Sequence, residues 1–129
     1  MPIRFNHTIV AAHDRQVAAN FLTELFGLPA PKPFGPFLAV ALDDGASLDY
    51  IEVPADEEIR AQHYAFLVSE QDFDDIYGRI TSWRLEHWGD PHGRHPGEIN
   101  HNDGGRGVYF NDPAGHFLEI ITRPYGSGG

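Results

Sequence analysis

The sequence predicts one α+β domain of 129 residues, built from two similar halves. Two observations support this prediction. Segments with the period-two alternation of strands stand beside segments with the longer period of amphipathic helices. The order of a strand, a helix and then two or three strands occurs twice along the chain. We place the first module at about residues 1–56, the second at about residues 60–124 and a flexible tail at residues 125–129.

The first half begins with a strand over residues 3–12, in which His7 shares one face with apolar neighbours. Asp14 is a suitable N-cap for the helix that follows, because a short polar side chain there accepts hydrogen bonds from the first helical amides. Residues 37–42 and 47–53 flank an Asp-Asp-Gly sequence and are predicted to form a hairpin. The apolar stripe of the helix consists of Val17, Phe21, Leu25 and Leu28.

The second half repeats this order. Residues 61–68 are predicted to form a strand, and Ser69 is predicted to cap the next helix. A loop rich in Gly, Pro and His follows over residues 89–105, and a second hairpin is predicted over residues 107–110 and 116–122. The apolar stripe of this helix consists of Phe73, Ile76, Tyr77, Ile80 and Trp83.

Superposing the two halves brings similar polar residues together. His63 of the second half falls on His7 of the first, and aligning the two hairpins at their glycines brings Asp49 opposite Glu119. Each half therefore holds a ligand-type residue in its first strand and another in its last strand. Because an open half-cup made of one unit buries little apolar surface, we expect such units to pair.

The composition excludes several classes of protein. The chain holds 9 Lys and Arg residues against 19 Asp and Glu residues, and its formal charge of −10 repels the phosphate backbone of nucleic acids. It has neither an apolar run of about 18 residues nor the apolar segment of a secretory signal, so we expect a cytoplasmic protein without a membrane span. Because it has no cysteine, any metal must be bound by imidazole and carboxylate groups.

Three residues at corresponding places of the repeat are candidate metal ligands. Glu119 lies in the apolar sequence Phe-Leu-Glu-Ile-Ile, where a buried carboxylate requires a metal ion or a cation such as Arg106 or Arg123 as its partner. His7 and His63 have equally apolar surroundings. A lone strand histidine is more often structural, and the shared position in the repeat favours ligation. Two imidazoles and one carboxylate form a facial triad that leaves coordination positions open for water or a substrate.

Strand-borne His7, the mid-chain His63 and the sequence Asn-Asp-Pro-Ala-Gly-His-Phe-Leu-Glu over residues 111–119 resemble the vicinal oxygen chelate superfamily of glyoxalases, bleomycin-resistance proteins and type I extradiol dioxygenases. The resemblance covers nearly the whole chain. It implies paired βαβββ modules, one divalent metal ion per site and a small substrate that chelates the metal through vicinal oxygens. It also implies a homodimer in which His7 of one chain faces His63 and Glu119 of the other. Fe(II) or Mn(II) is favoured, and Ni(II) or Zn(II) also fits.

Within this superfamily, the second half most resembles the extradiol ring-cleaving dioxygenases. His101 and Tyr109 stand where those enzymes have a His and a Tyr that line the substrate pocket, and that Tyr hydrogen-bonds the metal-bound catecholate oxygen. Asp49 stands where those enzymes have an acid–base His, and we expect it to act as the base. Arg106 is expected to bind an anionic group of the substrate or to cover the carboxylate face. The preferred function is oxygen-dependent ring cleavage.

Three other functions of the superfamily stay open. Glyoxalase I resembles a four-ligand version of the site, in which His7, Asp49, His63 and Glu119 would enclose Ni(II) or Zn(II). Fosfomycin-modifying transferases share the triad, but this chain has no convincing run of Lys, Ser and Tyr for their phosphonate and potassium sites. Metal-free drug-binding proteins of the bleomycin-resistance type bind a cationic ligand in an acidic cleft, which suits the charge of −10.

Overall fold

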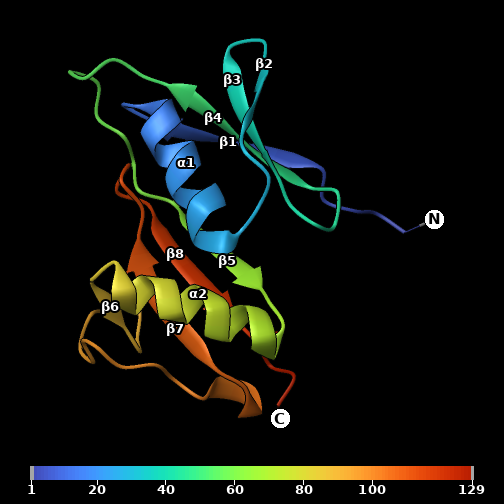
Figure 1. Ribbon diagram of the computed structural model, residues 1–129, viewed down its shortest axis with the longest axis vertical. Helices are drawn as coiled ribbons and strands as arrows, with labels where there is room; N and C mark the ends of the chain where they lie inside the picture. The colour runs from blue at the N-terminus through green and yellow to red at the C-terminus, as the bar shows by residue number, and fades with distance from the viewer. Residues whose placement is uncertain (1, 129) are drawn as a thin grey trace. The chain divides into compact units, whose positions relative to one another are not determined.

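The computed structural model describes residues 2–128. The chain divides into two compact units, unit 1 up to Arg60 and unit 2 from Ala61 onward. Within the described residues, each unit holds one four-stranded sheet and one α-helix, in the order strand, helix and three strands (Figure 1). The predicted α+β fold of two βαβββ modules is therefore confirmed. No helix within residues 2–128 is long and apolar enough to cross a membrane.

Unit 1 consists of β1 (His7–Ala12), α1 (Arg15–Phe26), β2 (Lys32–Phe34), β3 (Phe37–Ala41) and β4 (Ser47–Glu52). The strand order is β1-β4-β3-β2, with β1 and β4 parallel and the other neighbours antiparallel. Helix α1 lies over one face of this sheet (Figure 1). Alternate residues of each strand face the helix, because successive side chains of a strand point to opposite faces. The larger buried apolar side chains of this core are Val10, Leu22, Leu25, Leu38, Val40, Leu48 and Tyr50.

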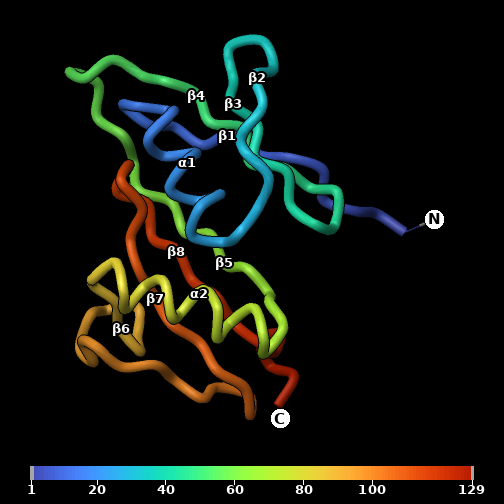
Figure 2. The backbone as a smooth tube through the Cα atoms, viewed as in Figure 1, coloured from blue at the N-terminus to red at the C-terminus, as the bar shows by residue number. Residues whose placement is uncertain are grey.

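Unit 2 consists of β5 (His63–Leu67), α2 (Glu70–Ser82), β6 (His87–Trp88), the 3-10 helix η1 (Asn102–Gly104), β7 (Gly107–Asn111) and β8 (Phe117–Ile121). The strand order is β5-β8-β7-β6, and the parallel neighbours β5 and β8 run side by side along the backbone trace (Figure 2). The buried apolar side chains of this core are Phe73, Ile76, Ile80, Val108, Phe110, Leu118 and Ile120.

Both helices begin at the residues that the sequence predicts. Asp14 Oδ1 accepts a hydrogen bond from the amide of Val17 at 3.1 Å, at the start of α1. Ser69 Oγ accepts a hydrogen bond from the amide of Asp72 at 3.0 Å, at the start of α2. Each cap satisfies one of the amides that has no partner within the first helical turn.

The open face of each sheet, defined as the face opposite its helix, carries the candidate polar residues. In unit 1 this face holds His7 on β1 and Asp49 on β4, and in unit 2 it holds His63 on β5 and Glu119 on β8. The registers of the two parallel strand pairs agree, because each carboxylate is aligned with the residue two positions after the histidine. The repeat in the sequence therefore corresponds to a repeat in strand register.

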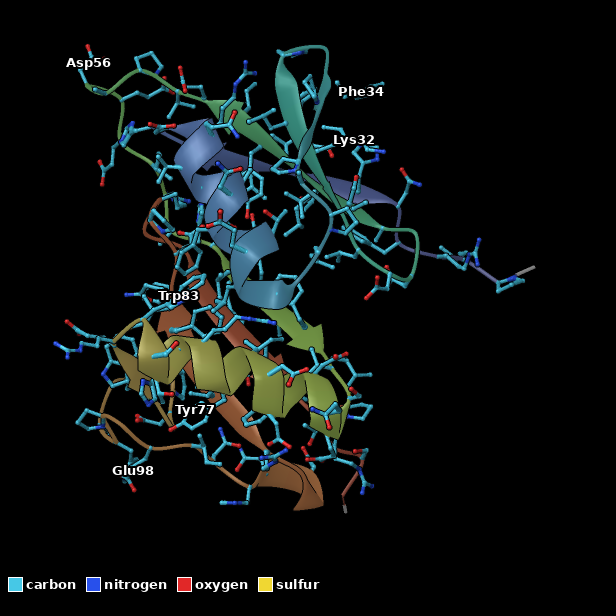
Figure 3. The ribbon with its side chains drawn as sticks, in the orientation of Figure 1. Lys32, Phe34, Asp56, Tyr77, Trp83 and Glu98 are labelled. Atoms are coloured by element: carbon cyan, nitrogen blue, oxygen red, sulfur yellow. The ribbon has the colours of Figure 1, made fainter. Side chains whose placement is uncertain are left out.

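Two strands are absent from the sequence prediction. Strand β2 has 3 residues and β6 has 2 residues, and both lie at the edge of their sheet. Such short strands show no period-two pattern from which they could be predicted. Phe34 on β2 is 69% exposed (Figure 3), so that this edge also lacks the buried side chains that mark a strand in sequence.

Candidate functional site

Glu119 and His63 form the centre of a polar cluster on the open face of unit 2. His63 Nε2 lies 3.0 Å from Glu119 Oε1. The side chain of Glu119 is fully buried, whereas that of His63 is 46% exposed. Because β5 and β8 are hydrogen-bonded neighbours, the backbone itself positions this pair. The structure thus brings together two of the three predicted metal ligands.

The chemistry of this pair fits a divalent metal ion. A buried carboxylate requires a partner for its charge, and within residues 2–128 no Lys or Arg side chain forms an ion pair with Glu119. Imidazole and carboxylate are ligands that most first-row divalent ions accept. Among the described residues, neither unit gathers three His, Asp or Glu side chains into a metal-binding group, so a complete site needs a further ligand beside this pair.

Two tyrosine hydroxyls complete the cluster. The Tyr125 hydroxyl donates to both carboxylate oxygens of Glu119, at 2.6 Å to Oε1 and 2.8 Å to Oε2. The Tyr109 hydroxyl lies 3.2 Å from that of Tyr125. The Tyr109 ring also stacks on His63, with ring centroids 6.0 Å apart and 26° between the planes. Tyr109, predicted as a site residue, therefore lies next to His63 and Glu119.

Tyr125 is a residue that the sequence analysis missed, because it was assigned to the flexible tail. One signal could have drawn attention to it, because it is a large aromatic residue in a glycine-rich segment. Its spacing from Glu119 could not, because β8 ends at Ile121 and the chain bends between the two residues.

The surroundings keep both phenols protonated. Burial raises the pKa of Tyr109, and the charge of Glu119 adds to the rise, while the hydrogen bond with Tyr125 opposes it. Burial and then the hydrogen bond to Glu119 raise the pKa of Tyr125 well above its usual range. Both hydroxyls therefore carry a proton at neutral pH and can donate it in a hydrogen bond.

A pocket of about 430 Å³ opens beside the cluster. His63 and Tyr109 lie in its wall together with the aromatic side chains of Trp88, Phe110 and Phe117. A pocket of this size with mainly apolar walls and a few polar groups is typical of a small-molecule site. Its aromatic walls favour a substrate that contains a ring, because flat ring faces pack well against aromatic side chains.

Asp90 holds the loop that forms another wall of this pocket, over residues 90–93. Asp90 Oδ1 accepts a hydrogen bond from the amide of His95 at 2.7 Å, and Oδ2 accepts from the amides of His92 at 3.2 Å and Arg94 at 3.1 Å. Burial acts to raise the pKa of Asp90, but these backbone hydrogen bonds outweigh it and lower the pKa. The loop is therefore tied to one charged side chain.

His7 and Asp49 are the corresponding residues of unit 1. Asp49 is buried, and its Oδ1 accepts a hydrogen bond from Ser47 Oγ at 2.9 Å. His7 is exposed, with its Nδ1 2.6 Å from Oδ1 of Asn6. The third predicted ligand therefore belongs to a different unit from the pair formed by His63 and Glu119.

Arg106 contacts helix α2. Its Nε donates to Glu70 Oε1 at 2.9 Å, its Nη1 donates to Asp74 Oδ1 at 2.8 Å, and its guanidinium carbon lies 4.5 Å from the centroid of the Phe73 ring. His101 is exposed and directly precedes η1. Among the described residues that line the pocket, neither Arg106 nor His101 occurs.

Comparison with known proteins identifies the family. Residues 4–120 match the family model described as Glyoxalase/Bleomycin resistance protein/Dioxygenase superfamily. The chain belongs to this superfamily. The resemblance inferred from His7, His63 and residues 111–119 is thereby confirmed.

Individual relatives carry different activities in their names. The chain is 58% identical to the solved structure of Oxidase ChaP-H2, with a TM-score of 0.95 and 100% of both chains covered. It is 57% identical to Oxidase ChaP-H1, with a TM-score of 0.91 and coverage of 97% of this chain and 99% of that one. It is 32% identical over 121 residues to the glutathione transferase FosA of Serratia marcescens, covering 89% of this chain and 77% of that protein. Membership of the superfamily therefore leaves the reaction open.

Proposed function

We propose that this protein is a divalent-metal-dependent enzyme that oxidises a small aromatic substrate, with oxygen-dependent cleavage of a catechol-type ring as the preferred reaction. One observation carries the proposal. The buried carboxylate of Glu119 is bonded to His63, has no Lys or Arg partner within the described residues, and lies beside an aromatic pocket. Two relatives at 57% and 58% identity are named oxidases, which supports oxidation over isomerisation.

His63, Glu119 and His7 would hold the metal. When bound, the ion supplies positive charge for the anionic form of the chelating substrate and coordination positions for substrate and oxygen. Because His7 belongs to unit 1, we propose that it comes from the second chain of a homodimer. Phe5 and Ile9 beside His7 are 67% and 54% exposed, and such exposed apolar side chains are typical of an interaction surface.

Tyr109 would be the hydrogen-bond donor to the substrate. Its phenol is protonated at neutral pH, lines the pocket and stacks on His63. It would donate to an anionic substrate oxygen, a role in which a positioned donor accelerates the reaction most. Trp88 and Phe117 would pack against the substrate ring and exclude water. Asp49 stays the proposed base, and its contact with Ser47 would orient the carboxylate.

The test is elemental analysis of the full-length protein purified without chelator, followed by oxygen uptake with a panel of catechols. We expect about one divalent ion per site and metal-dependent oxygen consumption, both lost in the double variant His63→Ala/Glu119→Ala. The matched control is His95→Ala/Glu98→Ala, which removes an exposed His–Glu pair of the same unit at 3.5 Å (Glu98 is labelled in Figure 3). A protein that takes up no metal would overturn the proposal and direct attention to sequestration of cationic small molecules.

Glyoxalase-type isomerisation is the second candidate. It is favoured by the register of Asp49, which stands in unit 1 where Glu119 stands in unit 2 and could serve as a fourth ligand. This reaction consumes a hemithioacetal without oxygen, so the two candidates separate in an anaerobic assay. Because one relative is named a glutathione transferase, transfer of glutathione should be assayed as well.

A further inference from the structure

The end of unit 2, residues 123–128, forms a segment that we call the C-terminal strap. It delivers the hydroxyl of Tyr125 to both carboxylate oxygens of Glu119, at 2.6 Å and 2.8 Å. Tyr125 as a whole is 62% exposed, whereas Glu119 is fully buried. The strap therefore covers the carboxylate from the solvent side with a single hydroxyl group.

Asp103 anchors this strap. Its Oδ2 accepts a hydrogen bond from the amide of Gly126 at 3.2 Å, and its Oδ1 accepts one from the amide of Gly128 at 3.3 Å. The strap also closes a turn on itself, because the amide of Ser127 donates to the carbonyl of Pro124 at 3.1 Å. Both carboxylate oxygens of Asp103 thus fix the segment that carries Tyr125.

The hydroxyl of Tyr125 contacts the same carboxylate oxygen of Glu119 that a metal ion would bind. Oε1 is the atom that faces His63 Nε2 at 3.0 Å, and it is also the atom that Tyr125 contacts most closely, at 2.6 Å. The second oxygen is taken by the same hydroxyl. An ion shared between His63 and Glu119 would bind the oxygen that Tyr125 contacts most closely, so the hydroxyl and the ion would compete for that atom.

We propose that Tyr125 is a residue of the metal site that competes with the metal for Glu119, and that metal binding releases the C-terminal strap from the carboxylate. This inference rests on the proposed metal-dependent function. The hydroxyl of Tyr109, 3.2 Å from that of Tyr125, offers the displaced phenol a partner in the wall of the pocket. Tyr125 would then set the affinity for the metal and link its binding to the opening of the site.

The experiment is calorimetric titration of the chelator-treated full-length protein with Mn²⁺ and, separately, Zn²⁺. Tyr125→Phe removes the competing hydroxyl and keeps the ring, so we expect its metal affinity to rise by about 10-fold, as for loss of one hydrogen bond to a charged group. Asp103→Ala, which frees the strap, should raise the affinity in the same direction. Tyr77→Phe is the matched control, because Tyr77 lies on α2 (Figure 3) with its hydroxyl 3.2 Å from His87 Nε2. The metal affinity of this variant should equal that of the wild type.

A second readout follows the strap itself. In the wild type, the amide resonances of Gly126 and Gly128 should shift on addition of metal. These amides donate to Asp103 while the strap contacts Glu119, and release of the strap would change their surroundings. An unchanged or weaker metal affinity of Tyr125→Phe would overturn the competition while leaving the metal site intact. Absence of metal binding by the wild type and by every variant would overturn the proposed function together with this inference.

Discussion

The open faces of the two sheets follow one plan and differ in chemistry. Strands β1 and β4 of unit 1 hold His7 and Asp49 in the same register in which β5 and β8 of unit 2 hold His63 and Glu119. In unit 2 the carboxylate reaches its histidine at 3.0 Å, whereas in unit 1 it accepts a hydrogen bond from Ser47 at 2.9 Å. The carboxylate of unit 1 is one methylene group shorter than that of unit 2 and accepts from a neighbouring hydroxyl. Among the described residues, the carboxylate of unit 2 is the one paired with the histidine of its own first strand.

The neighbouring antiparallel strand shows the same contrast. Tyr109 is the residue paired with Glu119, whereas Ala39 is the residue paired with Asp49. A phenol thus stands in unit 2 where unit 1 has a methyl group. The shared strand frame positions the side chains, and differences at a few register positions give unit 2 the pair and the aromatic pocket.

The strongest test of this contrast changes the two carboxylates separately. Glu119→Gln keeps the size of the side chain and its hydrogen-bonding ability but removes its charge, so metal affinity should fall by more than about 100-fold, since even loss of groups around a metal ligand costs 10- to 100-fold. Asp49→Asn should leave metal affinity within about 3-fold of the wild type, because Asp49 is hydrogen-bonded to Ser47 and not to a proposed ligand, so that the cost of losing a ligand's support does not apply. Metal titration by calorimetry measures both.

Equal losses in the two variants would contradict this assignment. They would mean that Asp49 binds the metal as a fourth ligand, and the glyoxalase-type candidate would then replace ring cleavage as the preferred function.

The second test removes the phenol that distinguishes the β7 side of the cluster. Tyr109→Phe should lower turnover by on the order of 10- to 100-fold, because a positioned hydrogen-bond donor is lost, while the metal content stays unchanged. Tyr77→Phe, which alters a phenol bonded to His87 in the same unit, should keep full turnover. Steady-state kinetics together with elemental analysis separate the two effects, and a Tyr109→Phe variant with wild-type turnover would remove Tyr109 from the proposed mechanism.

The sequence predicted those parts of the fold that leave a periodic pattern. The two helices, their caps at Asp14 and Ser69, and both hairpins agree with the structure. The predicted apolar stripe of α1 is wrong at Val17, which is 51% exposed, and at Leu28, which lies beyond the end of the helix. The edge strands β2 and β6 were not predicted, because their pairing depends on a neighbouring strand and their few residues show no alternation.

The candidate site was predictable only where strand geometry points side chains in a known direction. His63 and Glu119 share a face because of period two, and the repeat made them stand out. Tyr125 reaches Glu119 through the anchor at Asp103, a contact between loops that no local pattern encodes. Arg106 turns toward α2 because the carboxylates of that helix attract it, and its own neighbours in sequence do not reveal this.

The third test compares the two hairpin turns, in which the units agree in detail. Gly45 and Gly115 both have φ of +91°, and a Cβ atom at either position would meet nothing within 4 Å. Replacement by alanine should therefore cost only the backbone strain of a positive φ, about 1–2 kcal/mol at each position. Urea unfolding of Gly45→Ala and Gly115→Ala measures this cost. A clearly larger loss at one site would show that the two turns are less alike than their geometry indicates.

The last test concerns Asp112, which occupies the turn position that Leu42 occupies in unit 1. The two residues make equivalent backbone hydrogen bonds, from Leu42 to Ala46 and from Asp112 to His116. The Asp112 side chain is 7% exposed, its Oδ2 has no hydrogen-bond partner among the described residues, and burial raises its pKa. Because the pKa of Asp112 is raised in the folded state, its protonated form stabilises the fold at pH values below the ordinary aspartate pKa of about 3.9. This contribution to stability is lost as the pH rises through the folded-state pKa.

Asp112→Asn should remove this loss of stability at higher pH, because a neutral amide is less costly to bury than a carboxylate. The variant should therefore be more stable than the wild type near neutral pH, by about 1 kcal/mol, and the difference should shrink as the pH falls toward the ordinary value of an aspartate. Urea unfolding across this pH range measures the gap, with Asp44→Asn as the control for replacing an exposed turn carboxylate. A difference in stability between variant and wild type that stays constant at all pH values would contradict this prediction. It would mean that Asp112 acts through its hydrogen bonds to Ala114 and His116. The buried charge, which distinguishes this turn from its counterpart in unit 1, would then not lower the stability.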